Sequence, residues 1–119
     1  MTKIKETSTN FENKQSLIEC CATIYATDLL SGQWVLAICC MLENGKMRFG
    51  ELKKSIPGIT ERMLTLQLRK MEANKLIKRT VYAEVPPRVE YEMTPIAHEL
   101  DPIIKELQAW GEKHKKMMK

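Results

Sequence analysis

The sequence predicts a mainly α-helical fold with one small β-hairpin in its last third. Apolar residues recur at steps of three and four through most of the chain, the period of helices packed on a core. The period changes to two in Arg88–Met93, where apolar and charged residues alternate, and a second strand-like stretch, Leu76–Ala83, precedes it. Between them, Pro86 and Pro87 have no amide hydrogen for a strand ladder, which predicts a stiff loop.

Two helices are expected before the middle of the chain. The first covers about 14–30 and should stop at Ser31-Gly32. The second begins near Gln33 and is apolar on nearly every side through Leu42, which indicates a buried central helix. Asn44-Gly45 should end it.

Three further helices are expected. A short one covers about 49–56 and stops at Pro57, and a fourth begins after Thr60, whose hydroxyl can cap it, and ends near Asn74. Thr94-Pro95 is a start signal for a long final helix. Along that helix one apolar stripe repeats with alternating steps of four and three: Ile96, Leu100, Ile103, Leu107 and Trp110.

Length and composition predict one domain spanning 1–119, because 119 residues with 44% hydrophobic content can form one genuine core. The unpatterned ends, 1–13 and 115–119, are expected to be loose. The longest apolar run, Trp34–Leu42, is far shorter than the roughly 20 residues that cross a bilayer, so no membrane association is expected. The four cysteines form two adjacent pairs, a spacing that fits neither a zinc knuckle nor a secreted disulfide framework, and a cytoplasmic location is expected.

Positive charge is concentrated between Thr60 and Arg88. This stretch holds seven basic and three acidic residues, and its balance of +4 equals the net charge of the whole chain. Extending the stretch to Glu92 lowers its balance to +2. Such a local excess is expected of a surface that attracts nucleic-acid phosphates, and the alternative is an ordinary solvated helix beside a hairpin.

The fourth helix has a face suited to the edges of base pairs. Leu64, Leu68 and Met71 should turn toward the core, and no carboxylate falls within the opposite face. Arginine can bind guanine through two hydrogen bonds, and threonine or leucine methyl groups can contact thymine. The residues expected to contact DNA from this helix are Thr60, Arg62, Thr65, Leu66 and Arg69.

The hairpin loop supplies the remaining expected DNA contacts. Arg88 could hold a phosphate or enter a minor groove, while Pro86 and Pro87 limit the entropy lost on docking. Arg88 could also pair with Glu84 or Glu90. Arg79 shares strand parity with inward-facing residues, so for Arg79 a structural role facing a carboxylate of the second strand is preferred.

Together these segments resemble the HxlR-type winged helix-turn-helix transcriptional regulators. The matching pieces are Gly32-Gln33-Trp34, Arg48-Phe49-Gly50-Glu51-Leu52, Ile59-Thr60 with Met63-Leu64 and Leu68, Val85 to Tyr91, and Met93-Thr94. The resemblance implies a cytoplasmic regulator that binds double-stranded, pseudo-palindromic operator DNA as a homodimer. It also implies that helices at both chain ends form the subunit contact, with Leu17, Ile24, Ile103, Leu107 and Trp110 as the candidate interface residues.

The same resemblance singles out Cys21. Some family members sense oxidants or electrophiles through a cysteine thirteen positions before the tryptophan, which here is Cys21 before Trp34. A sensing thiol needs a lowered pKa and access to solvent, and neither is visible in the sequence. The alternative is that Cys21 is a small buried hydrophobe, and Cys39 and Cys40 are expected to be packing residues.

The sequence also bears on three other functions. The two histidines, His98 and His114, and the absence of a glycine-rich phosphate loop argue against an enzyme, so no catalytic residue and no cofactor is expected. A metal-sensing repressor would need ligand spacings that the cysteines do not have, so no metal site is expected. A winged helix used only as a protein-interaction module remains open, because fold does not establish function. The effector is unknown.

Overall fold

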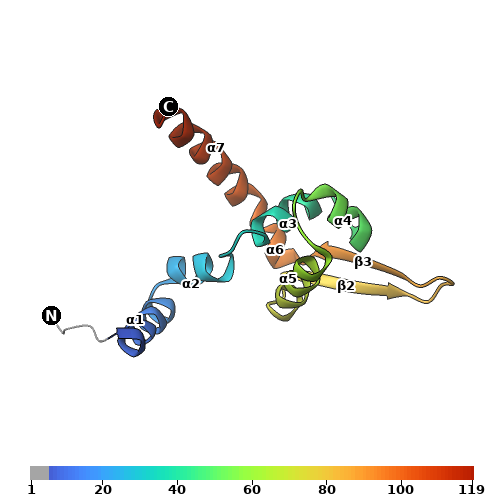
Figure 1. Ribbon diagram of the computed structural model, residues 1–119, viewed down its shortest axis with the longest axis horizontal. Helices are drawn as coiled ribbons and strands as arrows, with labels where there is room; N and C mark the ends of the chain where they lie inside the picture. Colours follow the sequence, from blue (N-terminus) through green and yellow to red (C-terminus); the bar gives the residue numbers. More distant parts are fainter. Residues whose placement is uncertain (1–5) are drawn as a thin grey trace. The chain divides into compact units, whose positions relative to one another are not determined.

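The computed structural model describes the backbone of residues 6–119 and the side chains from Asn13 onward. The chain divides into two compact units, the first ending at Gly32 and the second beginning at Gln33. Figure 1 shows the order of the elements, coloured from blue at the N-terminus to red at the C-terminus. A single domain over the whole chain therefore stays a prediction.

The first unit contains two helices in place of the expected single one. Helix α1 covers Glu6–Cys20 and α2 covers Ala22–Leu29, and between them Cys21 has the extended dihedrals φ −126° and ψ 112°. The break lets Lys14 of α1 reach Asp28 of α2 with an Nζ to Oδ1 distance of 3.2 Å. In one straight helix these residues would lie about 21 Å apart along the axis. The prediction of a continuous helix over 14–30 was wrong, and the expected loose N-terminal end is helical from Glu6.

The second unit is built on three helices. They are α3 (Val35–Leu42), α4 (Phe49–Ser55) and α5 (Glu61–Ala73). Helix α3 is the buried central helix, as expected, because Val35, Ile38, Cys39 and Leu42 have at most 1% of their surface exposed. The largest buried side chains on the other two helices are Leu52, Leu64 and Met71.

A three-stranded antiparallel sheet completes the second unit. Its order is β1-β3-β2, with β1 at Met47–Arg48, β2 at Ile77–Tyr82 and β3 at Arg88–Met93. The hairpin of β2 and β3 is where the sequence predicts it, with Ile77 opposite Met93 and Tyr82 opposite Arg88. Strand β1 was missed, because two residues are too short for a periodic signal, and it pairs Met47 with Tyr91.

The expected final helix is split in two. Helix α6 covers Pro95–His98, capped by the Thr94 hydroxyl, and α7 covers Asp101–Met117. Pro102 explains the break, because its ring removes the amide hydrogen that a continuous helix would bond to the His98 carbonyl. Helix α7 continues to Met117, so residues 115–117 are helical although a loose end is expected there.

Helices α3, α4 and α5 followed by the β2–β3 hairpin form a winged helix-turn-helix unit, with the hairpin as the wing (Figure 1). The predicted fold class, mainly α with a small hairpin, is confirmed. No helix within residues 6–119 is both long and apolar enough to cross a membrane.

Candidate nucleic-acid interface

Helix α5 is fixed at both ends and along one side. The Met63 backbone N–H donates to the Thr60 hydroxyl at 3.0 Å, which is the predicted N-cap. Leu64, Leu68 and Met71 bury the inner side. At the C-terminal end Lys75 takes a left-handed conformation with φ 61°, and the next backbone N–H, that of Leu76, donates to the Met71 carbonyl at 2.9 Å. The outer face is therefore presented by a rigid helix.

The outer face of α5 carries the predicted base-reading residues in the expected places. Arg62 and Arg69 are exposed, Leu66 is 50% exposed, and Thr65 is half-buried. Neither arginine forms an ion pair with any side chain of the described part of the chain. Both guanidinium groups are thus available to an external acceptor.

The wing tip is exposed, as a DNA-contacting loop requires. Val85, Pro86 and Pro87 all lie open to solvent. On the two strands that lead to the tip, the acidic residues of β3 all lie on one face of the hairpin. Glu90 and Glu92 of β3 share one face with Arg88, and we call this the reverse face because the opposite face of the hairpin is turned toward α5. Both carboxylates therefore lie away from α5.

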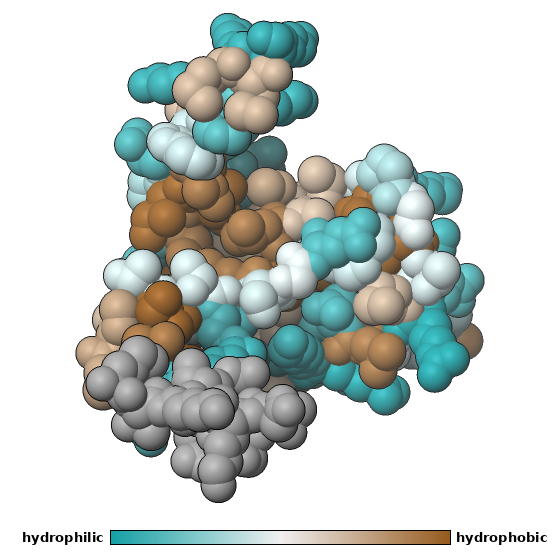
Figure 2. Space-filling model, turned by 60° about the vertical axis from the view of Figure 1, so that its left-hand side comes forward, coloured by the Kyte–Doolittle hydropathy of each residue, from teal (hydrophilic) through white to brown (hydrophobic). Residues whose placement is uncertain are grey.

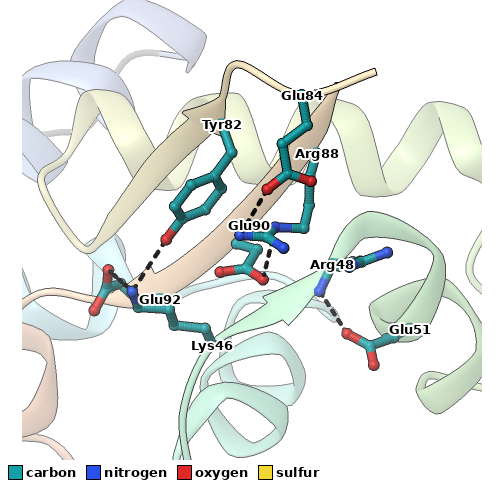
Figure 3. Close-up of polar contacts among 8 residues, drawn as sticks. All are labelled: Lys46, Arg48, Glu51, Tyr82, Glu84, Arg88, Glu90 and Glu92. Atoms are coloured by element: carbon teal, nitrogen blue, oxygen red, sulfur yellow. Dashed lines mark hydrogen bonds and ion pairs between the residues drawn. The ribbon is translucent and has the colours of Figure 1, made fainter. Parts of the chain in front are cut away.

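Arg88 is occupied by contacts within the reverse face (Figure 3). Its guanidinium lies 3.2 Å from Glu84 and 3.5 Å from Glu90, and it stacks on the Tyr82 ring at 4.2 Å from the centroid. The 3.5 Å approach of Nε to Glu90 is an ion pair without hydrogen-bond geometry, and Nε has no other acceptor. A direct contact between Arg88 and DNA stays a prediction.

Lys46 holds the other end of the same face. Its ammonium group lies 3.3 Å from the Tyr82 hydroxyl and 3.9 Å from Glu92 (Figure 3). The hydrogen bond from Lys46 to Tyr82 raises the pKa of the lysine, with Glu92 adding to the effect. Close by, the Arg48 backbone N–H donates to Glu51 at 2.8 Å and fixes the start of α4.

Arg79 was expected to face a carboxylate of the second strand, and the structure does not support that expectation. Arg79 is exposed, its cross-strand neighbour is Tyr91, and it forms no ion pair with any residue from Asn13 to Lys119. It lines an open pocket of about 440 Å³ between α5 and the sheet, together with Thr65, Arg69 and Glu72. The sequence feature that could have predicted this is strand parity, because it puts Arg79 on the hairpin face that has no acidic residue.

Cys21 has the two properties that a sensing thiol needs. It is half-exposed, and it is the N-cap residue of α2 because the helix breaks there. The neutral thiol makes no capping hydrogen bond, but the backbone N–H groups of Ile24 and then Thr23 stabilise the thiolate and lower the pKa of Cys21. Exposed Cys20 is its neighbour.

The other cysteines behave differently from one another. Cys39 is buried in α3, and burial raises its pKa to about 11, as expected of a packing residue. Cys40 is exposed, so for this residue the expectation of packing was wrong. No group of three potential metal ligands occurs among the described side chains. His98 lies 2.9 Å from Asp101 in the turn between α6 and α7.

Four of the five candidate interface residues at the two chain ends are exposed within one protomer, and the fifth, Ile24, is half-buried. In the first unit Leu17 is 54% exposed, and no side chain from Asn13 to Gly32 is buried. On α7, Ile103, Leu107 and Trp110 are each more than half exposed. Figure 2 shows hydrophobic surface over the base of the upright C-terminal helix, whereas its tip is mostly hydrophilic.

Comparison with known proteins agrees with this architecture. Residues 29–119 match the model of the HxlR-like helix-turn-helix family. The chain is 44% identical over 97 residues to the HTH-type transcriptional regulator YdeP of Bacillus subtilis strain 168, which covers 82% of this chain and 76% of YdeP. An HTH-type regulator of Methanothermobacter thermautotrophicus is 45% identical over 91 residues, covering 76% of this chain and 70% of that protein.

Two solved structures of redox-related regulators are also similar. The redox regulator HypR in its reduced form superposes with a TM-score of 0.77 at 38% identity, over 82% of this chain and 96% of HypR. Reduced YodB from B. subtilis gives a TM-score of 0.72 at 33% identity, over 79% of this chain and 92% of YodB. The chain belongs to the HxlR-type family of helix-turn-helix transcriptional regulators.

Proposed function

We propose that this regulator binds double-stranded operator DNA in a sequence-specific manner, with the outer face of α5 in the major groove. The observation that carries the proposal is the pair of exposed, unpaired guanidinium groups, Arg62 and Arg69, on a helix capped by Thr60 and anchored in the core. Thr65 and Leu66 lie on the same face and offer methyl groups to thymine. The Pro86-Pro87 wing tip lies over the adjacent backbone.

The regulator acts as a homodimer on a pseudo-palindromic site, in the cytoplasm. The exposed apolar residues of α7 and of the first unit support this proposal, because a water-exposed stripe of leucine, isoleucine and tryptophan is stabilised by a second copy. A two-fold dimer places two α5 helices about one DNA turn apart, which matches two half-sites of one operator.

DNA recognition is tested by selecting bound sequences from a random duplex pool and then titrating the selected and random duplexes. Arg62→Ala and Arg69→Ala should each cost about 1–3 kcal/mol of discrimination between the two duplexes. Lys113→Ala removes one positive charge from an exposed site on α7, outside the proposed face, and is the matched control. If the wild-type protein ignores duplex DNA even in dilute salt, the protein-interaction alternative replaces this proposal.

We further propose that oxidants or electrophiles regulate DNA binding through Cys21. Its thiolate is stabilised by α2 backbone amides and reaches solvent, and the similar protein HypR is named a redox regulator. One product is a disulfide between the Cys21 residues of two protomers: two thiols lose two protons and two electrons to an oxidant such as diamide, which is reduced to the hydrazine. Such a bond would fix the two N-terminal units together.

The redox proposal is tested by measuring operator affinity before and after diamide treatment. The wild-type affinity should change, whereas Cys21→Ser should not respond and Cys20→Ser, the matched control at the exposed neighbour, should respond like the wild type. Non-reducing electrophoresis identifies a disulfide-linked dimer. If Cys21→Ser still responds to the oxidant, the proposed role of Cys21 is refuted, whereas the proposal of DNA binding still stands.

A further inference from the structure

The two faces of the wing hairpin differ in how their charges are paired. On the reverse face the carboxylates of Glu90 and Glu92 are neutralised by Arg88 and Lys46 (Figure 3). The face toward α5 carries Arg79 as its one charged residue, between the buried Ile77 and the apolar Val81. The strand face turned toward the base-reading helix therefore carries one guanidinium, which forms no ion pair among the described residues.

Helix α5 contributes a second guanidinium to the same hollow. Arg69 and Arg79 both line the 440 Å³ pocket, and the hydroxyl-bearing Thr65 lies one turn before Arg69. Glu72 lines the pocket too, one turn beyond Arg69, and forms no ion pair within the described residues. Two cations against one anion leave the pocket positively charged.

We propose that this pocket binds a phosphate of the DNA backbone, with Arg79 as the principal contact. Guanidinium groups present parallel N–H donors that match phosphate oxygens, so Arg79 can bind the anion while Arg69, assigned above to base reading, adds its positive charge to the pocket. Arg79 lies on the strand face beside α5. In the proposed complex, a phosphate bound there would belong to the DNA strand next to the groove that α5 enters. The inference rests on the proposed DNA binding and adds a contact that sequence reasoning assigned to structure.

Arg88 has a different role in this scheme. Its pairs with Glu84 and Glu90 and its stacking on Tyr82 tie the wing tip to both strands, so Arg88 is a positioning residue. Removing Arg88 frees two carboxylates near the tip, whereas removing Arg79 frees none. Arg79 is therefore the wing arginine whose loss subtracts a phosphate contact without releasing a carboxylate.

The test measures, by fluorescence titration, how the affinity for a random duplex depends on salt concentration. Arg79→Ala should weaken binding about tenfold at low salt and reduce the slope of log affinity against log salt by about one. Lys78→Ala is the matched control, because it removes the same charge from the adjacent residue on the reverse face, and its loss should be within about threefold. Arg79→Lys keeps the charge but loses the paired N–H donors of the guanidinium, so its affinity should lie between those of the wild type and Arg79→Ala.

Each outcome is decisive. Equal losses in Arg79→Ala and Lys78→Ala overturn the phosphate site while leaving DNA binding intact, because they show only general attraction. Failure of the wild type to bind duplex overturns the proposed function itself. Far-UV circular dichroism and the thermal midpoint of each variant must match the wild type, and since Arg79 is exposed, its removal leaves no buried group unpaired.

Discussion

Trp110 on α7 should contribute strongly to dimer stability. Its side chain is 61% exposed in one protomer, on the same helix face as Ile103 and Leu107. A tryptophan offers about 250 Å² of surface, so about 150 Å² remains open to a partner. If the interface covers half of that area, the gain is about 2 kcal/mol per tryptophan at about 25 cal/mol per Å². A two-fold interface uses the residue twice, which gives about 4 kcal/mol per dimer, or roughly a thousandfold in Kd.

The assay is sedimentation equilibrium of Trp110→Ala against the wild type over a range of protein concentrations. Gln108→Ala is the matched control, because Gln108 is exposed on the opposite side of the same helix and its loss should leave the dimer constant unchanged. Circular dichroism checks that α7 stays helical. A dimer constant for Trp110→Ala within a few fold of the wild type, or an equal loss in Gln108→Ala, would refute the reasoning and move the interface elsewhere.

Three further predictions concern stability and thiol chemistry. Thr60→Ala removes the acceptor of the Met63 N–H and should lower the free energy of unfolding by about 1 kcal/mol in urea titration, whereas Thr60→Ser should not. Lys75→Gly relieves a left-handed conformation and should raise the free energy of unfolding by about 0.5–1 kcal/mol, and a loss would contradict this. Cys21 has a lowered pKa, whereas partial desolvation and the nearby Glu43 raise the pKa of Cys40, so at neutral pH Cys21 should react with iodoacetamide faster than Cys40; mass spectrometry of labelled peptides checks the order.

Much of the fold could be predicted because local signals and tertiary packing agree in this chain. The Thr60 side chain caps the N-terminus of α5, and Pro57 lies just beyond the end of α4. These helix boundaries could therefore be predicted from side-chain chemistry. The alternation of apolar and charged residues in Arg88–Met93 predicted both ends of β3 correctly. Strand β1 was invisible, because its existence depends on its partner β3 and not on any period of its own.

The break at Cys21 could not be predicted from periodicity. Leu17, Cys21 and Ile24 keep helical spacing across it, so the sequence favours continuity. The ion pair between Lys14 and Asp28 requires the chain to fold back, and such long-range contacts leave no local pattern. The consequence for function is large, because the break turns a cysteine within a helix into one at a helix N-terminus, where the thiolate is stabilised.

The charge count along the sequence also missed how the wing is arranged. In the linear count, extending the basic stretch to Glu92 halves its excess, which weakens the case for a phosphate-binding surface. In the folded hairpin the added carboxylates, Glu90 and Glu92, lie on the reverse face and are neutralised there by Arg88 and Lys46. Pairing and screening limit the effect of these two acids on the side of the hairpin that faces α5, where Arg79 is the one charged residue of the two strands. Charge should therefore be counted by strand face, and that count supports the proposal that Arg79 is the wing residue with a phosphate contact.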